Sequence, residues 1–191
     1  MKVAKGKYFF LLNSDTILVN NAIDEFYHYA ENHDPKTVYG CWLVGDDGTY
    51  RRSFFFFPSF TIRHFLHVKF NPHDYSPKWD AREVECVTGA DMFFPREAYE
   101  QCGGFDENIF MYGEEGELQY RMMRKGYRRM LINTPRIIHL ESKSYKPSKK
   151  MSNIRLKGHL YVLRKWMDPF TYIVARFFYF MVGIASRLNL I

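Results

Sequence analysis

Cysteine is scarce in this chain of 191 residues, which contains only Cys41, Cys86 and Cys102. The number is odd, no two of the three form a C-x-x-C pair, and none has metal-ligand spacing with a histidine. The sequence therefore gives no sign of a disulfide framework or of a cysteine-based metal module. Reduced thiols in a cytoplasmic protein are the expectation.

Long hydrophobic runs are also few. Near the N-terminus, the apolar run Tyr8–Leu12 is too short for the core of a secretory signal peptide. The most apolar stretch, Pro169–Ala185, is interrupted by Thr171 and Arg176 and is marginal for crossing a hydrocarbon core of about 30 Å. We expect it to form a helix that lies on the inner face of the plasma membrane rather than one that spans the bilayer.

Internal repeats, low-complexity tracts and recognised nucleic-acid-binding modules are absent from the sequence, and nucleic acid is not an expected partner. What is present is a composition of 47% apolar and 18% aromatic residues, sufficient for a sizeable core. The 27 basic and 21 acidic side chains give a net charge of +6. This balance favours anionic partners such as phosphates, nucleotides or an anionic lipid surface. The oligomeric state is left open.

Short apolar runs alternate with segments of helical spacing, a pattern typical of an α/β fold with a mixed sheet flanked by helices. Residues 1–150 are expected to form the main domain, and residues 151–191 a C-terminal helical segment. The expected strands are 7–12, 37–44, 49–57, 83–87, 90–94, 128–132 and 136–140, with 37–44 and 49–57 forming a hairpin about a turn at 45–48. The expected helices are 22–30, behind a cap at Asn20 or Asn21, then 60–68, 96–102, 115–125, 153–166 and 169–188.

An acidic cluster, Glu114, Glu115 and Glu117, opens the expected helix 115–125. Two interpretations are open. Three carboxylates so close together repel one another, which favours one of them as a proton acceptor in catalysis. Alternatively, acidic side chains in a first turn complement the helix dipole, and Glu117 and Arg121 have the spacing of a surface ion pair. The apolar run Ile109–Tyr112, just before the cluster, favours the catalytic interpretation because it anchors the start of the helix.

Asp15 follows the expected strand 7–12, where ligands of open α/β sheets usually bind. A carboxylate there can hold Mg²⁺ or Mn²⁺ on a diphosphate, although Asn13-Ser14-Asp15-Thr16 also has the composition of an ordinary turn. His139, at the end of the expected strand 136–140, is either a hydrogen-bonded structural residue or a ligand. The lysines of 143–150 form either a solvated loop or a clamp for a diphosphate.

Taken in order along the chain, these segments resemble a known family, although no single segment is specific for it. The chain is similar to the family 2 glycosyltransferases with a GT-A fold, particularly the bacterial rhamnosyltransferase-like members of cell-surface polysaccharide synthesis. The likeness covers roughly residues 3–144. It rests on Ala4-Lys5-Gly6-Lys7-Tyr8 with Leu11-Leu12-Asn13-Ser14-Asp15-Thr16, on Thr88-Gly89-Ala90, on Arg96 with Gly103-Gly104-Phe105-Asp106-Glu107 and Phe110, and on Tyr112-Gly113-Glu114-Glu115-Gly116-Glu117-Leu118, Arg121, Gly126-Tyr127, Pro135 and His139.

The resemblance implies transfer of a sugar from a dTDP- or UDP-sugar to a glycan or lipid-linked acceptor, with inversion at the anomeric carbon. Asn13 and Asp15 would then bind the donor, with Asp15 and His139 on a Mg²⁺ or Mn²⁺ ion. Glu114 or Glu115 would be the base that deprotonates the acceptor. The remaining substrate-binding residues implied are Gly89, Ala90, Asp91, Glu117 and Arg121.

Two departures from the family pattern stand out. The family usually has Glu-Asp where this chain has Glu114-Glu115, and Asp in place of Glu117, and an added methylene moves a base by more than about 1 Å. The strand-helix units that bind the nucleotide in the family come before the strand at 7–12, which here begins almost at Met1. The sequence thus predicts an N-terminally truncated GT-A fold that by itself binds donor weakly or not at all. The alternative function is a non-catalytic remnant that binds a membrane or a partner.

Overall fold

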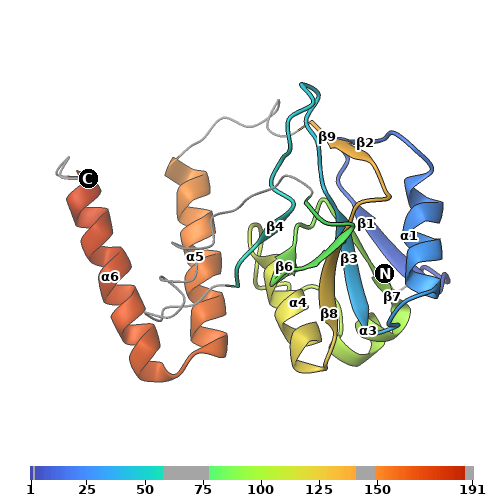
Figure 1. Ribbon diagram of the computed structural model, residues 1–191. Helices are drawn as coiled ribbons and strands as arrows, with labels where there is room; N and C mark the ends of the chain where they lie inside the picture. Colours follow the sequence, from blue (N-terminus) through green and yellow to red (C-terminus); the bar gives the residue numbers. More distant parts are fainter. Residues whose placement is uncertain (2, 58–77, 141–148, 188–191) are drawn as a thin grey trace. The chain divides into compact units, whose positions relative to one another are not determined.

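The computed structural model describes residues 1, 3–57, 78–140 and 149–187 (Figure 1). These residues belong to two compact units. The first contains the described parts of 1–57, 78–106 and 114–140, and the second contains 107–113 and 149–187. The domain boundary expected at residue 150 stays a prediction.

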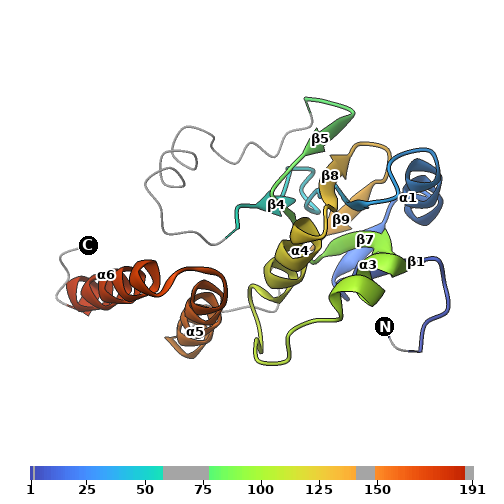
Figure 2. The ribbon, with the colours of Figure 1, turned by 90° about the horizontal axis from the view of Figure 1, so that it is seen from below.

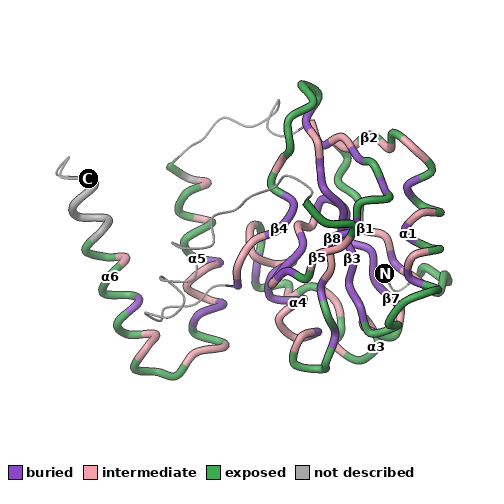
Figure 3. Tube along the Cα trace, in the orientation of Figure 1, coloured by how far each residue is buried: buried purple, intermediate pink, exposed green. Residues whose placement is uncertain are grey.

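A five-stranded mixed sheet forms the centre of the first unit. Its third and fourth strands in spatial order are parallel, and the other neighbouring pairs are antiparallel. The two strands at its centre are buried along their whole length, as Figure 3 shows. The spatial order is β1 (Tyr8–Leu12), β7 (Asp91–Pro95), β3 (Thr37–Cys41), β8 (Arg128–Ile132) and β5 (Ala81–Glu83).

One face of this sheet is covered by α1 (Ala22–Glu31), whose apolar positions recur at helical spacing. Phe26 of α1 is fully buried and stacks on Phe93 of β7, with ring centroids 5.4 Å apart. Burial of a phenylalanine side chain stabilises the fold by about 1.5–3 kcal/mol. Asn21 is the N-cap, as expected, but its side chain makes no capping hydrogen bond and instead contacts the carboxylate of Asp24.

The opposite face is covered by α3 (Arg96–Cys102) and α4 (Glu114–Arg124) (Figure 2). Leu118 and Met122 of α4 are fully buried in this second cluster, together with alternate residues of the strands. The central strands therefore bury both faces. This is why their sequences read as nearly continuous apolar runs.

Two small sheets lie beside the main one. β2 (Thr16–Leu18) pairs with β9 (Ile137–His139), and β4 (Phe54–Phe55) pairs with β6 (Cys86–Val87), both antiparallel. The hairpin expected between 37–44 and 49–57 is confirmed only next to its turn, where Val44 and Tyr50 form an antiparallel bridge and Gly45 N–H donates to Thr49 O over 2.8 Å. Farther along, Phe54 and Phe55 pair with β6. Burial of Phe54 against the core outweighs the local pairing.

The second unit contains α5 (Lys149–Trp166) and α6 (Pro169–Arg187), joined by a hydrogen-bonding contact of 2.9 Å between Tyr179 Oη and His159 Nε2. Within this unit, a Cβ on Gly158 would lie 3.1 Å from the carbonyl oxygen of Tyr112, so the glycine permits that close approach. No helix among the described residues is long and apolar enough to cross a membrane.

Most of the expected elements are present within one to four residues of their predicted ends. The helix at 96–102 and the strand at 128–132 are confirmed residue for residue. The strand expected at 83–87 is divided between β5 and β6. The helix expected at 60–68 lies outside the described residues, as does the expected lysine loop except Lys149 and Lys150, which begin α5.

Candidate functional site

Asn13, Asp15 and His139 meet at the carboxyl end of β1. The turn after β1 is closed by the Thr16 hydroxyl, which donates to Asn13 O over 2.7 Å. Pairing of β2 with β9 then places His139 opposite Thr16. As a result, His139 Nε2 lies 3.4 Å from Asp15 Oδ1 and 3.4 Å from Asn13 Nδ2. The structure thus brings together three predicted site residues from segments more than a hundred positions apart in the chain.

This arrangement suits a divalent cation that is shared with a substrate. The Asp15 side chain is 46% exposed, while that of His139 is 9% exposed. Carboxylate, imidazole and amide oxygen are ligands that Mn²⁺ accepts. No group of three or more His, Cys, Asp or Glu side chains able to hold a metal occurs among the described residues. Mg²⁺ in proteins commonly keeps several water ligands and binds through one or two carboxylates and the phosphates of a substrate.

The acidic cluster lies at the start of α4. The two residues before the helix, Tyr112 and Gly113, have φ angles of 69° and 102°. The left-handed region is uncommon for a tyrosine, so the backbone entering α4 is constrained at this point. Glu114 Oε2 is buried and has no hydrogen-bond partner among the described residues.

Glu115 packs directly on Gly89, in the turn between β6 and β7. A Cβ placed on Gly89 would lie 3.3 Å from Glu115 Cβ and 3.5 Å from its Cγ. Any larger residue at position 89 would force the acidic side chain to move. Burial raises the pKa of the Cys86 thiol, and the negative charge of the nearby Glu115 raises it further.

Ala90 connects this acidic side of the site with the Asp15 side. Its carbonyl accepts a hydrogen bond of 3.0 Å from the Asn13 backbone N–H. Gly89 therefore touches Glu115, and its neighbour Ala90 holds the turn that carries Asp15. Sequence order gave no sign of this link, because the three segments are far apart along the chain.

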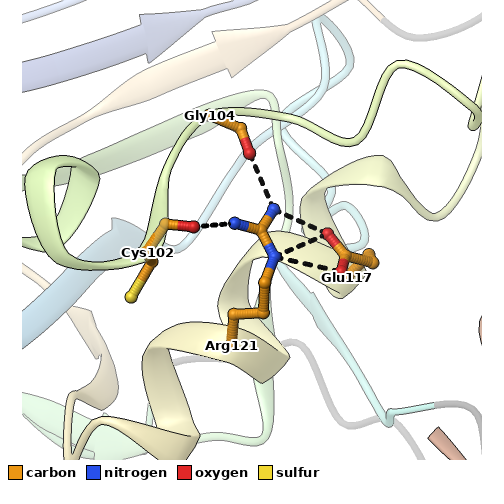
Figure 4. Close-up of polar contacts among 4 residues, drawn as sticks. All are labelled: Cys102, Gly104, Glu117 and Arg121. Carbon is orange, nitrogen blue, oxygen red and sulfur yellow. Dashed lines mark hydrogen bonds and ion pairs between the residues drawn. The ribbon is translucent and has the colours of Figure 1, made fainter. Parts of the chain in front are cut away.

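Glu117 and Arg121 form a buried ion pair (Figure 4). Arg121 Nη2 donates to Glu117 Oε2 over 2.7 Å, and Nε lies 3.0 and 2.9 Å from the two carboxylate oxygens. The same guanidinium donates to the carbonyls of Cys102 and of Gly104, the latter over 2.7 Å. The ion pair expected from the spacing of Glu117 and Arg121 is confirmed, but its expected place on the surface is wrong, because Glu117 is 0% exposed. These contacts tie α4 to the end of α3; a contact with substrate stays a prediction.

Asp91 is buried in the middle of the sheet. Its Oδ2 accepts a 2.6 Å hydrogen bond from the Cys41 backbone N–H, and Oδ1 has no partner among the described residues. Burial raises the pKa of this carboxyl to about 7. Its predicted role in substrate binding remains untested, and the contacts seen here join β7 to β3.

Gln119 is a site-supporting residue that sequence reasoning missed. Its amide pairs with the backbone of Val87 through two hydrogen bonds of 2.9 and 2.8 Å, as a neighbouring strand would. This attaches α4 to β6, two residues before Gly89. The available signal was a polar residue next to Leu118 on the apolar face of an amphipathic helix.

Comparisons with known proteins identify the family and the fold of this chain. The model of the family described as "Glycosyltransferase like family 2" matches residues 1–156. The O-antigen biosynthesis protein RfbC of Myxococcus xanthus is 28% identical over 157 residues, which are 75% of this chain and 12% of RfbC. A crystal structure of GalNAc-T7 with UDP, GalNAc and Mn²⁺ has a TM-score of 0.60 at 16% identity, over 86% of this chain and 34% of that one. The predicted GT-A fold is confirmed, and the chain spans only a minor part of each relative.

Proposed function

Because the chain belongs to the glycosyltransferase-like family 2, we propose that it is the catalytic side of an enzyme that transfers a sugar from a UDP- or dTDP-sugar to a glycan or lipid-linked acceptor. The observation that carries this proposal is the link through Gly89 and Ala90. Through these two residues, the turn that carries Asp15, which is suited to bind a cation, adjoins the helix start that carries Glu115, which is suited to act as a base. The relatives support the chemistry: one is an O-antigen biosynthesis protein, and the other was crystallised with UDP, GalNAc and Mn²⁺.

In this proposal, Asp15 and His139 hold the diphosphate end of the donor, together with Mg²⁺ or Mn²⁺. The cation supplies Lewis-acid neutralisation of the departing diphosphate. His139 Nε2, which lies 3.4 Å from Asp15 Oδ1, orients the Asp15 carboxylate, and the carbonyl of Asn13 accepts the Thr16 hydrogen bond that closes the turn. Residues from two distant segments therefore present one polar surface at the end of β1.

Glu115 or Glu114 takes the proton from the acceptor hydroxyl. The acceptor oxygen then attacks the anomeric carbon of the donor sugar from the face opposite the departing nucleoside diphosphate. Glu115 is held by its packing on Gly89, and Glu114 has a buried oxygen without a partner among the described residues. A base in a fixed position is worth roughly 10²–10⁴ in rate.

The direct test of the cation site is Mn²⁺ binding, in the presence of UDP, to the polypeptide that contains this chain and its nucleotide-binding part, followed by electron paramagnetic resonance. Asp15→Ala is expected to weaken binding at least tenfold, whereas Asp47→Ala, which changes an exposed carboxylate elsewhere, should not. Equal Mn²⁺ affinity of the wild type and both variants would contradict the assignment of Asp15 as a cation ligand.

The base is tested by sugar transfer in the polypeptide that contains this chain and its nucleotide-binding part. Glu115→Gln or Glu114→Gln should lower kcat by 10²-fold or more with KM for the donor little changed. Wild-type transfer by both variants would contradict the assignment of the base to Glu114 or Glu115, whereas the absence of transfer by the wild-type polypeptide would support the non-catalytic alternative.

We also propose that α6 places the protein on the inner face of the plasma membrane. Its exposed apolar side chains recur at helical spacing along one stripe, which is the pattern of an interfacial helix. The stripe consists of Phe170, Ile173, Val174, Phe177, Phe178 and Met181, with exposed fractions of 41–76%. Phe177→Glu should reduce co-sedimentation with anionic vesicles, whereas Tyr50→Glu should not; equal losses would contradict the proposal.

A further inference from the structure

The segment that leads to Gly89 is held along one edge by β4. Thr88, the residue before Gly89, donates its backbone N–H to Ser53 O over 3.1 Å. This bond continues the antiparallel pairing of β4 with β6. Successive residues of a strand turn their backbone groups to opposite sides, so the N–H and C=O of Val87 point away from β4. These two groups therefore need a partner on the other edge of β6.

Val87 is a firm point of attachment because it is packed on the main sheet. Its side chain is fully buried, and a Cβ placed on Gly40 of β3 would lie 3.1 Å from Val87 Cβ. A contact this close leaves β6 little room to move toward β3. A helix that is held to Val87 is thus held relative to the central sheet.

Gln119 of α4 is the partner on that edge. Its Oε1 accepts a hydrogen bond of 2.9 Å from the Val87 N–H, and its Nε2 donates to the Val87 carbonyl over 2.8 Å. An amide side chain can do both because it carries a donor and an acceptor side by side. Hydrogen bonds are directional and apolar packing is not, so these two bonds fix the position of α4 along β6.

Glu115 lies one helical turn before Gln119, on the same face of α4. Gln119 binds Val87, and Glu115 packs on Gly89, two residues farther along the chain from Val87. Four residues of a helix rise about 6 Å, and two residues of extended chain span about 7 Å. The two contacts are therefore spaced almost equally on the helix and on the segment 87–89, so that fixing one fixes the other.

The first turn of α4 also rests on β4. A Cβ on Gly116 would lie 3.2 Å from Phe55 Cε2, so the glycine lets the aromatic ring approach the helix backbone. This contact limits how closely α4 approaches β4. It does not fix the position of the helix along its axis, because an apolar ring edge has no directional partner. The directional contact beside it is that of Gln119.

We infer that Gln119 is a positioning residue for the transfer reaction, because through Val87 it fixes where Glu115 stands relative to Gly89. This inference rests on the proposed function, which assigns the base to the acidic cluster. Loss of both hydrogen bonds lets α4 shift along β6, which itself stays anchored to β3 and β4. The shift displaces the Glu115 carboxylate and leaves the Asp15 turn in place. A misplacement of about 1 Å costs up to about 10² in rate.

The test uses the polypeptide that contains this chain and its nucleotide-binding part. Gln119→Met removes both hydrogen bonds and keeps the length of the side chain. We expect it to lower kcat for sugar transfer at least tenfold and to change KM for the donor less than twofold. Met122→Ala is the matched control, since it loosens the apolar packing of the same helix but leaves the Val87 bonds in place. It should keep kcat within threefold of the wild type.

A double-mutant cycle separates positioning from a general loss of stability. In a Glu115→Gln background, adding Gln119→Met should change the remaining transfer less than twofold, because the group that Gln119 positions is already gone. Gln119→Asn, whose shorter side chain cannot keep both bonds, covers the case in which Gln119→Met does not fold, and should lower kcat at least threefold. Wild-type kcat in a folded Gln119 variant, an equal loss in Met122→Ala, or a tenfold further loss in the Glu115→Gln background would overturn the inference.

The proposed function fails separately. In protein labelled with ¹⁵N-glycine, the Gly89 amide resonance reports the packing contact without catalysis, and it should shift more in Gln119→Met than in Met122→Ala. If it shifts while Glu115→Gln keeps wild-type transfer, Gln119 still sets the contact and the catalytic assignment of Glu115 falls. If it does not shift while Glu115→Gln abolishes transfer, the base stands and the positioning role of Gln119 falls.

Discussion

Glu115 lies against Gly89 so closely that the glycine has no room for a side chain without moving the glutamate. The hypothetical Cβ at position 89 would be 3.3 Å from Glu115 Cβ. Contacts this tight require the neighbour to shift by a few tenths of an ångström. The position of the candidate base therefore depends on the absence of one methyl group in a turn that is 26 residues away in sequence.

Gly89→Ala should accordingly lower kcat for sugar transfer by about tenfold, because small displacements of a catalytic group cost up to about 10² in rate. The loss of stability should stay near 1 kcal/mol, the lower end of overpacking costs. Steady-state kinetics and urea unfolding of the same variant measure the two effects. An unchanged kcat would show that Glu115 does not need this position.

Arg121→Met should destabilise the protein by about 3–5 kcal/mol, because it leaves the Glu117 carboxylate buried and unpaired with that guanidinium. Arg128→Met is the matched control. It breaks an exposed pair with Glu83, in which both side chains are 50% exposed, and should cost at most about 1 kcal/mol. Urea unfolding compares the two. Similar losses would contradict a structural role for the buried pair.

Asp91 should make stability depend on pH in the acidic range. Its folded-state pKa is raised from 3.8 to about 7, so the native state holds the proton more tightly than the unfolded state does. The associated stability is complete below about pH 4 and is lost as pH rises toward 7, at up to about 1.4 kcal/mol per pH unit. Asp91→Asn should flatten this part of the profile, measured by urea unfolding between pH 4 and 7. Asp47→Asn, at an exposed position, should leave the slope in place.

Gln119→Leu should cost about 2–4 kcal/mol, since it leaves both the N–H and the C=O of Val87 without their present partner in a buried site. Gln119→Glu keeps one acceptor but loses the donor to the Val87 carbonyl, and should also be less stable than the wild type. Thermal unfolding measures both variants. Wild-type stability of Gln119→Leu would mean that α4 is held to β6 by apolar packing alone.

The sequence by itself determined the elements whose cause is local. The helix at 96–102 ends at Gly103 because its φ of 76° suits glycine, and the strand at 128–132 lies between Gly126 and the turn-forming residues Asn133-Thr134-Pro135. The order of the motifs was sufficient to indicate the family, because that information lies along the chain. Asp15 and the glutamates were identified as candidates by residue type and by their places after a strand and at a helix start.

The tertiary structure alone decided what these residues touch. Periodicity placed Glu117 at the start of a helix but did not show that α3 and its following turn would cover it and supply carbonyls to Arg121. It did not pair β4 with β6, since burial of Phe54 is set by the whole core. The approach of Glu115 to Gly89 and the Asn13 bond to Ala90 join segments that local rules treat separately. Site geometry arises from packing between distant segments, and packing has no signature within any one of them.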